Sequence, residues 1–344
     1  MLETTDHMRE ANTPTPPAVA DAAIAARSLR RTFKGGIEAV RDIDLTVSAG
    51  EVFGFLGPNG AGKTTTVRML CTLLPPTAGD AKVAGLDVVK HGAEVRRRIG
   101  VALQEIGLDP VQTGRELLEL QCGLYGITGQ RGRDRANQLL ELVGLTEAAD
   151  RRTKTYSGGM KRRLDLGSAL VHSPDVLFLD EPTTGLDPAS RLTIWDEVRR
   201  INAGGATVFL TTQYLEEADK LCDRLAIIDN GRIVAEGTPE QLKAEMGHDV
   251  VSVSVEASDV AGTRAALSGL AGLERVMVEA GGLALYVDDG PGSIAEIVRR
   301  LEREQVPVGA ISVARPSLDD VFLTATGRRL EGQEAAQAPA EVNQ

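Results

Sequence analysis

The sequence predicts an α/β protein with a parallel β-sheet, followed by a small α+β domain. Two observations support the first part. Short, fully apolar segments alternate with helical stretches, and a glycine-rich loop at 57–65 (GPNGAGKTT) joins a buried strand to a helix. One observation supports the second part: after about Gly247 the expected order of elements is β-α-β-β-α-β, which is typical of a ferredoxin-like domain.

The first elements lead into the glycine-rich loop. Residues 1–21 are rich in Thr, Pro and Ala and are expected to form a disordered tail. Apolar and polar residues alternate over 22–33 and 43–47, which indicates strands. The run at 51–56 (EVFGFL) is short and apolar, as in a buried strand, and a helix is expected over 64–74.

A helical insert and further buried strands follow. Apolar residues recur with spacings near 3.6 over 115–125 and 133–143, so about 105–160 is expected to form a helical subdomain. Three apolar segments are expected to add strands to the parallel sheet: 175–180 (DVLFLD), 206–211 (ATVFLT) and 224–229 (RLAIID). The first domain is therefore predicted over 22–247.

The second domain, expected over 248–327, is predicted from shorter elements. Strands are expected at 250–256, 273–279, 283–288 and 308–314, and helices at 260–270 and 293–304. Gly281 and Gly282 lie between the two middle strands and indicate a hairpin.

A last helix is expected over 317–326. Its residues Leu318, Val321 and Phe322 are spaced i, i+3, i+4 and form one apolar face. This face either closes the core of the second domain or docks onto a second copy of the chain or a membrane partner. A disordered tail is expected over 328–344.

Composition limits the classes of function. The chain has 344 residues, 42% of them hydrophobic, which suits one to three domains with a sizeable core. Cys71, Cys122 and Cys222 are scattered, which favours reduced thiols over a disulfide or zinc framework. The net charge of −11 argues against nucleic acid as a partner. No apolar run approaches the ~18 residues that span a bilayer, and no secretion signal is recognised, so a membrane role is expected through a partner.

Residues 57–65 fit the pattern G-x-x-x-x-G-K-[ST] and are called the phosphate loop below. The candidate binding residues are Gly57, Pro58, Asn59, Gly60, Ala61, Gly62, Lys63, Thr64 and Thr65. The glycines let successive N–H groups point at a phosphate, and the helix N-terminus adds positive charge. Lys63 supplies a cation for the β- and γ-phosphates, and the Thr64 hydroxyl suits Mg²⁺. The alternative is an ordinary glycine-rich turn with a capping threonine.

Two carboxylates end the apolar strand at 175–180. Asp180 can hold Mg²⁺ directly or through water, because it ends a buried strand beside a phosphate loop. Glu181 can polarise an attacking water as a general base. The alternative is an ordinary pair of carboxylates that face solvent.

Residues 156–160 (YSGGM), called the signature loop below, indicate a second anion site. Ser157, Gly158 and Gly159 open a helix, so their backbone N–H groups can face an anion. The alternative is a glycine loop with Ser157 as a simple N-cap.

These motifs resemble those of ATP-binding-cassette (ABC) ATPases. The segment YSGGMKRR looks like their signature sequence, and VLFLDEPTTGLDP follows it. The resemblance covers about 24–240, with six motifs in the order of the family: Phe33, the phosphate loop, Gln104, the signature loop, Asp180-Glu181 and Gly185-Leu186-Asp187. It implies a RecA-like P-loop NTPase fold with a helical subdomain, and ATP hydrolysis.

The resemblance also implies a role for each matched residue. Phe33 would stack on adenine, with hydrophobic packing as the alternative. The phosphate loop, with Lys63, would hold the phosphates of ATP. Thr64, Gln104 and Asp180 would arrange Mg²⁺, and Glu181 would polarise the water.

The family further implies partners. Ser157, Gly158 and Gly159 would reach ATP bound on another copy, so the working unit would be a head-to-tail dimer with two ATP molecules between the chains. Asp187 would help tie these sites together. A symmetric homodimer is expected, with a heterodimer left open. The dimer would drive a separate integral membrane permease from the cytoplasmic, inner face of the cell membrane.

One position departs from the family pattern. ABC ATPases usually have a histidine after the strand at 206–211, in contact with the γ-phosphate, and here Gln213 takes its place. The chain has four histidines, none of them there: His7, His91, His172 and His248. The Gln213 amide can donate a hydrogen bond but carries no charge, which puts the rate of turnover in question.

The segments TTQYLEEAD at 211–219 and PSLDDVFL at 316–323 are similar to the daunorubicin/doxorubicin-resistance subfamily of drug-exporter ATPases. This similarity implies the ATP-hydrolysing subunit of an exporter of drugs or natural products. Three alternatives stay open: an exporter ATPase for lipid, polysaccharide or ion cargo, a soluble ABC protein that acts on ribosomes or DNA, and an importer ATPase with a regulatory tail.

Overall fold

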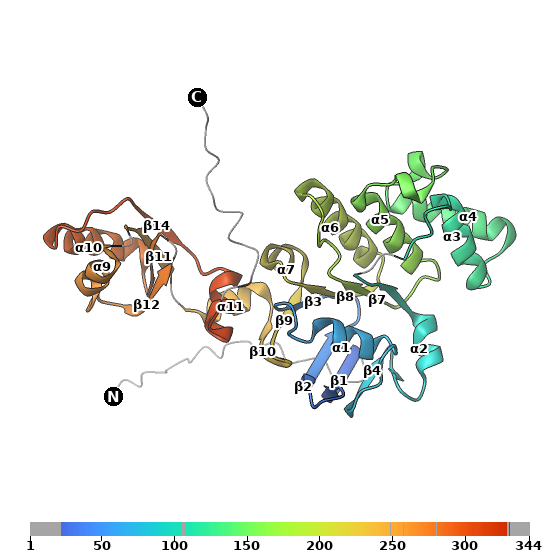
Figure 1. Ribbon diagram of the computed structural model, residues 1–344, viewed down its shortest axis with the longest axis horizontal. Helices are drawn as coiled ribbons and strands as arrows, with labels where there is room; N and C mark the ends of the chain where they lie inside the picture. Colours follow the sequence, from blue (N-terminus) through green and yellow to red (C-terminus); the bar gives the residue numbers. More distant parts are fainter. Residues whose placement is uncertain are drawn as a thin grey trace, which may run out of the picture.

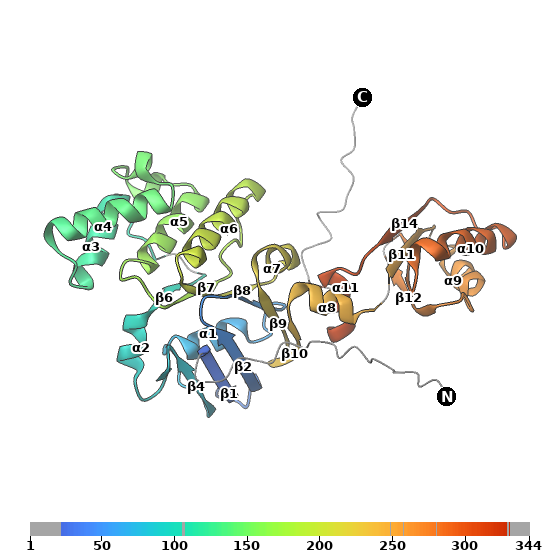
Figure 2. The ribbon, with the colours of Figure 1, turned by 180° about the vertical axis from the view of Figure 1, so that it is seen from behind.

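The computed structural model describes residues 22–104, 107–247, 249–256, 258–279, 281–328 and 330. The predicted tail at 1–21, and the part of the second tail from 331 onward, lie outside these residues. Figures 1 and 2 show the first domain at one side and the small C-terminal sheet at the other, with the last helix between them. None of the described helices is both long and apolar enough to cross a membrane.

A six-stranded sheet in the order β10-β9-β3-β8-β7-β6 forms the centre of the first domain. Its strands are β3 (Val52–Leu56), β6 (Ile99–Ala102), β7 (Val176–Asp180), β8 (Thr207–Thr212), β9 (Arg224–Asp229) and β10 (Arg232–Gly237). All neighbouring pairs from β9 to β6 are parallel, and β10 is antiparallel to β9. The predicted parallel sheet is therefore confirmed.

The strand register brings three loops to one edge of this sheet. In the pairing of β3 with β8, Leu56 lies beside Thr212, and in the pairing of β7 with β8, Asp180 lies beside Thr211. The residues that follow these three strands are the phosphate loop, Glu181 and Gln213. Parallel strands end at the same edge, so segments far apart in the sequence meet there.

Helices cover both faces of the sheet. On one face, α1 (Lys63–Leu70) packs near an aromatic layer in which Phe209 contacts Phe53, Phe55 and Phe178. On the other face lie α5 (Gly158–Ala169), α6 (Pro188–Ala203) and α7 (Leu215–Leu221). Helix α1 ends earlier than the predicted 64–74, because Thr72 has a left-handed φ of 64°.

A second, antiparallel sheet in the order β2-β1-β4-β5 also belongs to the first domain. Its strands are β1 (Ala22–Thr32), β2 (Glu38–Ser48), β4 (Ala78–Val83) and β5 (Leu86–Asp87). Helix α2 (Gly92–Arg98) then leads into β6. The sequence analysis missed β4 and β5, because AGDAKV is largely polar and exposed, and only Ala81 and Val83 of β4 are buried.

The helical insert contains α3 (Gly114–Leu124) and α4 (Gly129–Leu142), followed by the short 3-10 helices η1 (Thr146–Ala148) and η2 (Thr153–Thr155). The apolar spacings predicted both α-helices, and their buried residues form one core with α5. The hydroxyl of Tyr156, the first residue of the signature loop, donates a 2.6 Å hydrogen bond to the Ala148 carbonyl. This bond anchors the signature loop to the insert.

The C-terminal sheet has the order β12-β13-β11-β14, with every neighbouring pair antiparallel. Its strands are β11 (Asp249–Ser254), β12 (Leu273–Glu279), β13 (Gly282–Val287) and β14 (Ala310–Ala314). Helices α9 (Val260–Leu267) and α10 (Gly290–Arg303) cover one face, where Ile297 and Leu301 pack on Val251 and Leu285. This order is the ferredoxin-like arrangement that the sequence predicted.

Helix α11 (Leu318–Thr326) packs on its own first domain, beside α8 (Pro239–Glu245). Its apolar residues Leu318, Val321 and Phe322 form a cluster with residues of β3, α7, β9 and α8, which are Leu56, Leu215, Ala218, Leu225, Ile227 and Leu242. Both expectations for this face, the core of the second domain and a different molecule, are therefore wrong. Amphipathicity identified the face but not the surface that covers it.

Further contacts hold this helix between the two domains. The Tyr286 hydroxyl of β13 donates a 2.8 Å hydrogen bond to Asp320, and Arg275 of β12 donates one of 2.8 Å to Thr324. Past the helix, Arg328 pairs with Asp229 and Leu330 is buried in the cluster on the first domain. The tail predicted from 328 thus begins with residues that are packed.

The variant Phe322→Ala is expected to destabilise the first domain by about 3–5 kcal/mol, since it removes a fully buried aromatic ring. Trp195 is the single tryptophan and lies in α6, so its fluorescence reports unfolding of the first domain. We expect its urea midpoint to fall. Thr324→Ala, which removes only an exposed hydrogen bond from Arg275, is the control and is expected to lower the midpoint much less. An equal midpoint for the two variants would contradict this packing.

Candidate functional site

The phosphate loop connects β3 to α1, and its glycines are required by close approaches. A Cβ atom on Gly57 would lie 2.3 Å from the Ile228 carbonyl oxygen, and one on Gly62 would lie 2.5 Å from that of Ala39. Gly62 also has a φ of 110°, which favours glycine. The Gly57 N–H donates to the Thr212 carbonyl at 3.2 Å, which ties the loop to β8.

Lys63 folds back across this loop. Its Nζ donates hydrogen bonds to the carbonyls of Gly57 at 2.7 Å and Pro58 at 3.1 Å, and lies 3.2 Å from Oε1 of Glu181. Both charged side chains are buried. Burial lowers the pKa of Lys63, while the Glu181 carboxylate opposes this shift. The ammonium group therefore lies inside the loop, where a phosphate would replace these weaker partners.

Asp180 and Thr64 form a small oxygen-rich site next to Lys63. Asp180 Oδ1 accepts hydrogen bonds from the Thr211 hydroxyl at 2.6 Å and the Thr64 hydroxyl at 3.3 Å. The other oxygen, Oδ2, is buried and makes no hydrogen bond among the described residues. A buried carboxylate oxygen without a partner, beside a hydroxyl, fits a hard cation such as Mg²⁺.

Gln104 comes two residues after β6, the neighbour of β7. Its side chain is exposed at the same edge of the sheet that carries Asp180. The topology therefore places Gln104 on the side of the predicted Mg²⁺ site, although no hydrogen bond joins the two residues within the described part of the chain.

The backbone of Glu181 is held in an unusual conformation. Its φ is 49°, a left-handed value that costs a non-glycine residue roughly 1 kcal/mol or more. Its N–H donates to the carbonyl and hydroxyl oxygens of Thr211 at 3.1 and 3.0 Å, and the Thr184 hydroxyl donates to Oε2 at 3.2 Å. The carboxylate is thus directed at the loop that carries Lys63.

Gln213 follows β8 and is half-buried. The residue before it, Thr212, accepts the hydrogen bond from the phosphate loop, and α7 begins two residues later. The Arg191 guanidinium lies over the next side chain, Tyr214, at 4.8 Å. The backbone at Gln213 therefore leaves the sheet at the same edge as the phosphate loop, and an amide side chain at this position is able to donate a hydrogen bond.

A buried carboxylate on α7 escaped the sequence analysis. Glu217 Oε1 accepts hydrogen bonds from the Thr183 hydroxyl at 2.9 Å and the Trp195 indole at 3.0 Å. Burial raises the pKa of Glu217, and these hydrogen bonds oppose the shift. Through the hydrogen bond from Thr183, Glu217 links the loop after Glu181 to α7, the helix after Gln213. Its spacing to Leu221 (i, i+4) was the available signal that it lies on the buried face.

The signature loop and Asp187 lie side by side. Ser157 caps α5 by accepting a 3.2 Å hydrogen bond from Met160 N–H, and Asp187 caps α6 by accepting two from Ser190, at 3.0 Å from N–H and 2.6 Å from the hydroxyl. A Cβ atom on Gly159 would lie 2.8 Å from the Ser190 hydroxyl. Among the described residues, no hydrogen bond joins this region to the phosphate loop.

Phe33 follows β1 and is 38% exposed as a residue, and the Arg31 guanidinium lies 4.9 Å from its ring centroid. The ring is therefore not part of a hydrophobic core. It remains available for stacking on a flat ligand.

The comparisons with known proteins decide the family. Residues 40–184 match the family described as ABC transporter, and residues 237–326 match the one described as ATP-binding protein DrrA1-3-like, C-terminal domain. The daunorubicin resistance ATP-binding protein DrrA2 of Streptomyces coeruleorubidus is 47% identical, over 92% of this chain and 98% of its own length. The chain belongs to the ATP-binding subunits of ABC transporters. It binds and hydrolyses ATP, and the resemblance inferred from its motifs is confirmed.

Two further similarities support this assignment of the chain to the ABC family. The daunorubicin/doxorubicin resistance ATP-binding protein DrrA of Streptomyces peucetius is 44% identical over 93% of this chain and 97% of its own. The dimeric structure of MJ0796, a bacterial ABC transporter cassette, matches with a TM-score of 0.58 and 26% identity, over 62% of this chain and 98% of that chain.

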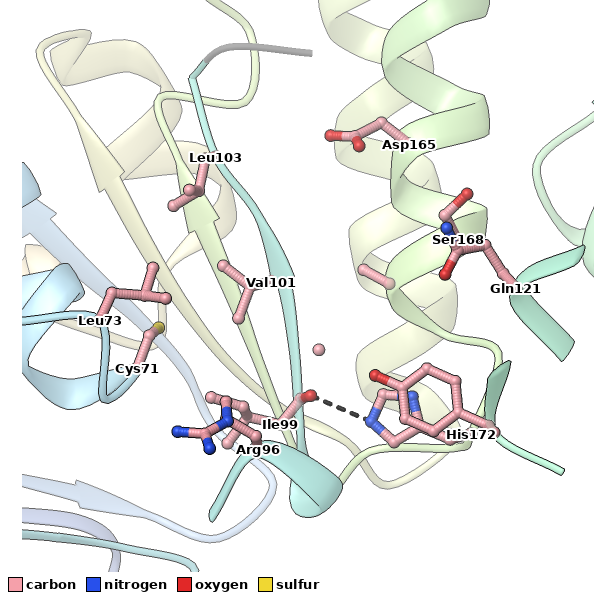
Figure 3. A pocket seen from close by; sticks show the side chains of 13 residues that line it. Cys71, Leu73, Arg96, Ile99, Val101, Leu103, Gln121, Asp165, Ser168 and His172 are labelled. Atoms are coloured by element: carbon pink, nitrogen blue, oxygen red, sulfur yellow. Dashed lines mark hydrogen bonds between the residues drawn. The ribbon is translucent and has the colours of Figure 1, made fainter. Parts of the chain in front are cut away.

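A cavity of about 390 Å³ lies elsewhere in this ABC subunit (Figure 3). It is lined by Cys71 at the end of α1 opposite Lys63, and by residues of β6, α3 and α5. His172 Nε2 lies 3.0 Å from the Ile99 carbonyl oxygen, and the imidazole stacks on Tyr125 at 4.0 Å. Burial lowers the pKa of His172. This cavity is separate from the phosphate loop.

Proposed function

We propose that this chain is the ATP-hydrolysing subunit that powers an exporter of a drug or natural product. The observation that carries the proposal is the similarity to daunorubicin-resistance ATP-binding proteins, which extends through the C-terminal domain at 237–326. The geometry at the phosphate loop supports the ATPase part, since Lys63, Asp180 and Glu181 meet there.

The residues of the phosphate loop hold the triphosphate. Backbone N–H groups of the phosphate loop after Pro58 and the N-terminus of α1 face its oxygens, and Lys63 binds the β- and γ-phosphates. Thr64, Asp180 and Gln104 hold Mg²⁺, which supplies positive charge opposite the phosphate oxygens. The Oδ2 atom of Asp180, which has no hydrogen-bond partner in the described part of the chain, supports this assignment.

Glu181 acts as the general base. In the structure its Oε1 is paired with Lys63 at 3.2 Å. A γ-phosphate gives Lys63 a stronger partner, which leaves Oε1 free to accept a proton from the attacking water. Thr184 keeps the carboxylate oriented through Oε2, and Gln213 donates a hydrogen bond to a γ-phosphate oxygen.

The complete site needs a second chain. Ser157, Gly158 and Gly159 contact ATP bound on the partner copy, and Asp187 lies where the two chains meet. Phe33 stacks on adenine. The homodimer works at the inner face of the cell membrane, with an integral membrane permease that selects the cargo. The catalytic unit spans 22–247, with its helical subdomain at about 105–160, and the accessory domain spans 248–327.

Transport in membrane vesicles tests the proposal. The gene beside this one is expected to encode a protein with several apolar membrane helices. Vesicles that contain both proteins are expected to move a fluorescent anthracycline only with MgATP, and not when the chain carries Glu181→Gln. Transport of a lipid or polysaccharide but no anthracycline would contradict the proposed class of cargo. Purification of the chain with ribosomes would contradict its assignment to an exporter.

The variant Gln213→Ala is expected to slow hydrolysis by roughly 5- to 150-fold, because a γ-phosphate oxygen loses a donor worth about 1–3 kcal/mol. The change in affinity for MgATP is expected to be smaller. Gln213→His is the matched control and should keep activity, since one ring nitrogen can donate. The rate of ATP turnover measures the effect on hydrolysis, and a nucleotide titration measures the affinity for MgATP. Full activity in Gln213→Ala would show that this amide does not contact the phosphate.

A further inference from the structure

Arg162 is a buried cation whose three hydrogen bonds to backbone carbonyls lead toward the catalytic loops. It lies in α5, five residues after Ser157, and only 4% of its surface is exposed. Its Nε donates to the Pro182 carbonyl at 3.0 Å, Nη2 to the Asp180 carbonyl at 3.0 Å, and Nη1 to the Leu103 carbonyl at 2.6 Å. One guanidinium thus joins three segments that are distant in the sequence.

Two of these carbonyls bracket the proposed general base. Asp180 and Pro182 are the residues on either side of Glu181, whose backbone is held at a φ of 49°. A rigid, planar guanidinium that binds both carbonyls fixes the direction of the peptide units around Glu181. The third carbonyl, of Leu103, precedes Gln104, so the same group also fixes the start of that loop.

A carboxylate on the same helix also contacts the Arg162 guanidinium. The Nη1 atom of Arg162 lies 3.4 Å from Oδ2 of Asp165, one turn along α5, and Figure 3 shows the Asp165 carboxylate projecting from the helix. Burial lowers the pKa of Arg162, and the carboxylates of Asp165, Asp180 and Glu217 oppose the shift. Removing a guanidinium from water is costly, and here the compensating hydrogen bonds go to backbone atoms around the active site.

Arg163, the next residue, shows that this arrangement is specific to Arg162. Its Nη1 donates to the carbonyls of Val143 and Gly144, both at 3.1 Å, in the segment after α4. Two adjacent arginines on one helix therefore point in different directions, one toward the catalytic loops and one toward the helical insert. Arg163 is a matched control.

We propose that Arg162 is a positioning residue that fixes the backbone on both sides of Glu181 against the helix that begins at the signature loop. The proposal rests on the role proposed above for Glu181. It predicts that changes at Arg162 impair hydrolysis through Glu181 and leave nucleotide binding by the phosphate loop intact. A residue that only supports the fold would impair both.

Steady-state hydrolysis by the purified full chain tests this. Arg162→Lys keeps the buried charge but cannot donate to all three carbonyls in the planar geometry of a guanidinium. Arg162→Gln removes the charge. Two variants are used so that one remains measurable if the other does not fold. We expect kcat to fall roughly 10- to 100-fold, the scale of a misplaced catalytic group, with MgATP affinity changed less than about threefold. Arg163→Lys is expected to keep kcat within about twofold.

A double-mutant cycle shows whether Arg162 acts through Glu181. In a chain that carries Glu181→Gln, adding Arg162→Lys is expected to change the residual hydrolysis by less than about twofold, because the group that it positions is already lost. A further loss as large as in the wild-type background would overturn the proposal. So would a loss of MgATP affinity equal to the loss of kcat/KM, or full turnover in both Arg162 variants.

These results separate this proposal from the proposed function. If Glu181→Gln alone leaves turnover intact, the role of Glu181 is wrong and the proposal for Arg162 is overturned with it. If Glu181→Gln abolishes turnover while Arg162→Lys and Arg162→Gln hydrolyse ATP at the wild-type rate, only the inference about Arg162 is overturned.

Discussion

The variant Glu181→Gln is expected to bind MgATP and to lose most hydrolysis, by roughly 10²–10⁴-fold, because a general base contributes about that much. Glutamine has the same shape but cannot accept the proton of the attacking water. It still accepts the 3.2 Å hydrogen bond from Thr184, so the local structure is expected to persist. ATP-bound dimers are expected to accumulate, since hydrolysis no longer separates the chains.

Three measurements check this result: turnover, MgATP affinity by fluorescence titration, and size by gel filtration with MgATP. Glu216→Gln is the matched control, because it removes an exposed carboxylate from α7 close to the same site. It is expected to behave as the wild type. Turnover in Glu181→Gln within about threefold of wild type would mean that another group takes the proton.

The central sheet and the phosphate loop could be predicted because their signals are local. β3, β7, β8 and β9 are short and have a buried apolar run at their centre, as is typical of strands covered on both faces. The glycines of the phosphate loop follow from the close approach of the backbone to Ile228 and Ala39. Apolar residues in these strands indicate burial, and glycines in this loop indicate a close backbone contact, so both features can be recognised from the residue types alone.

The partners of amphipathic and charged residues could not be predicted in the same way. The apolar face of α11 shows that something covers it, but its partners come from β3, α7, β9 and α8. Arg162 and Glu217 are charged residues, which are expected at the surface, and only the tertiary structure buries them against the segment at 180–183. The contacts that hold the catalytic loops therefore came from the structure alone.

The second large effect concerns Lys63. Lys63→Ala is expected to weaken MgATP binding by roughly 10- to 150-fold, because it removes a charge-assisted contact of about 1.5–3 kcal/mol with the phosphates. Lys90→Ala, which removes an exposed ammonium group, is the control and should leave affinity unchanged. Unchanged affinity in Lys63→Ala would show that the phosphate loop does not hold ATP.

The pairing of Lys63 with Glu181 adds a second expectation that separates binding from stability. Both side chains are buried, so Lys63→Ala leaves the Glu181 carboxylate without its cation, and losing one partner of a buried pair costs about 3–5 kcal/mol. The urea midpoint of the nucleotide-free protein, followed by Trp195 fluorescence, is therefore expected to fall. Adding Glu181→Gln removes the unpaired charge, so the double variant is expected to regain most of this stability but none of the lost affinity. If affinity returned together with stability, Lys63 would act only by neutralising Glu181, and its direct contact with the phosphates would be ruled out.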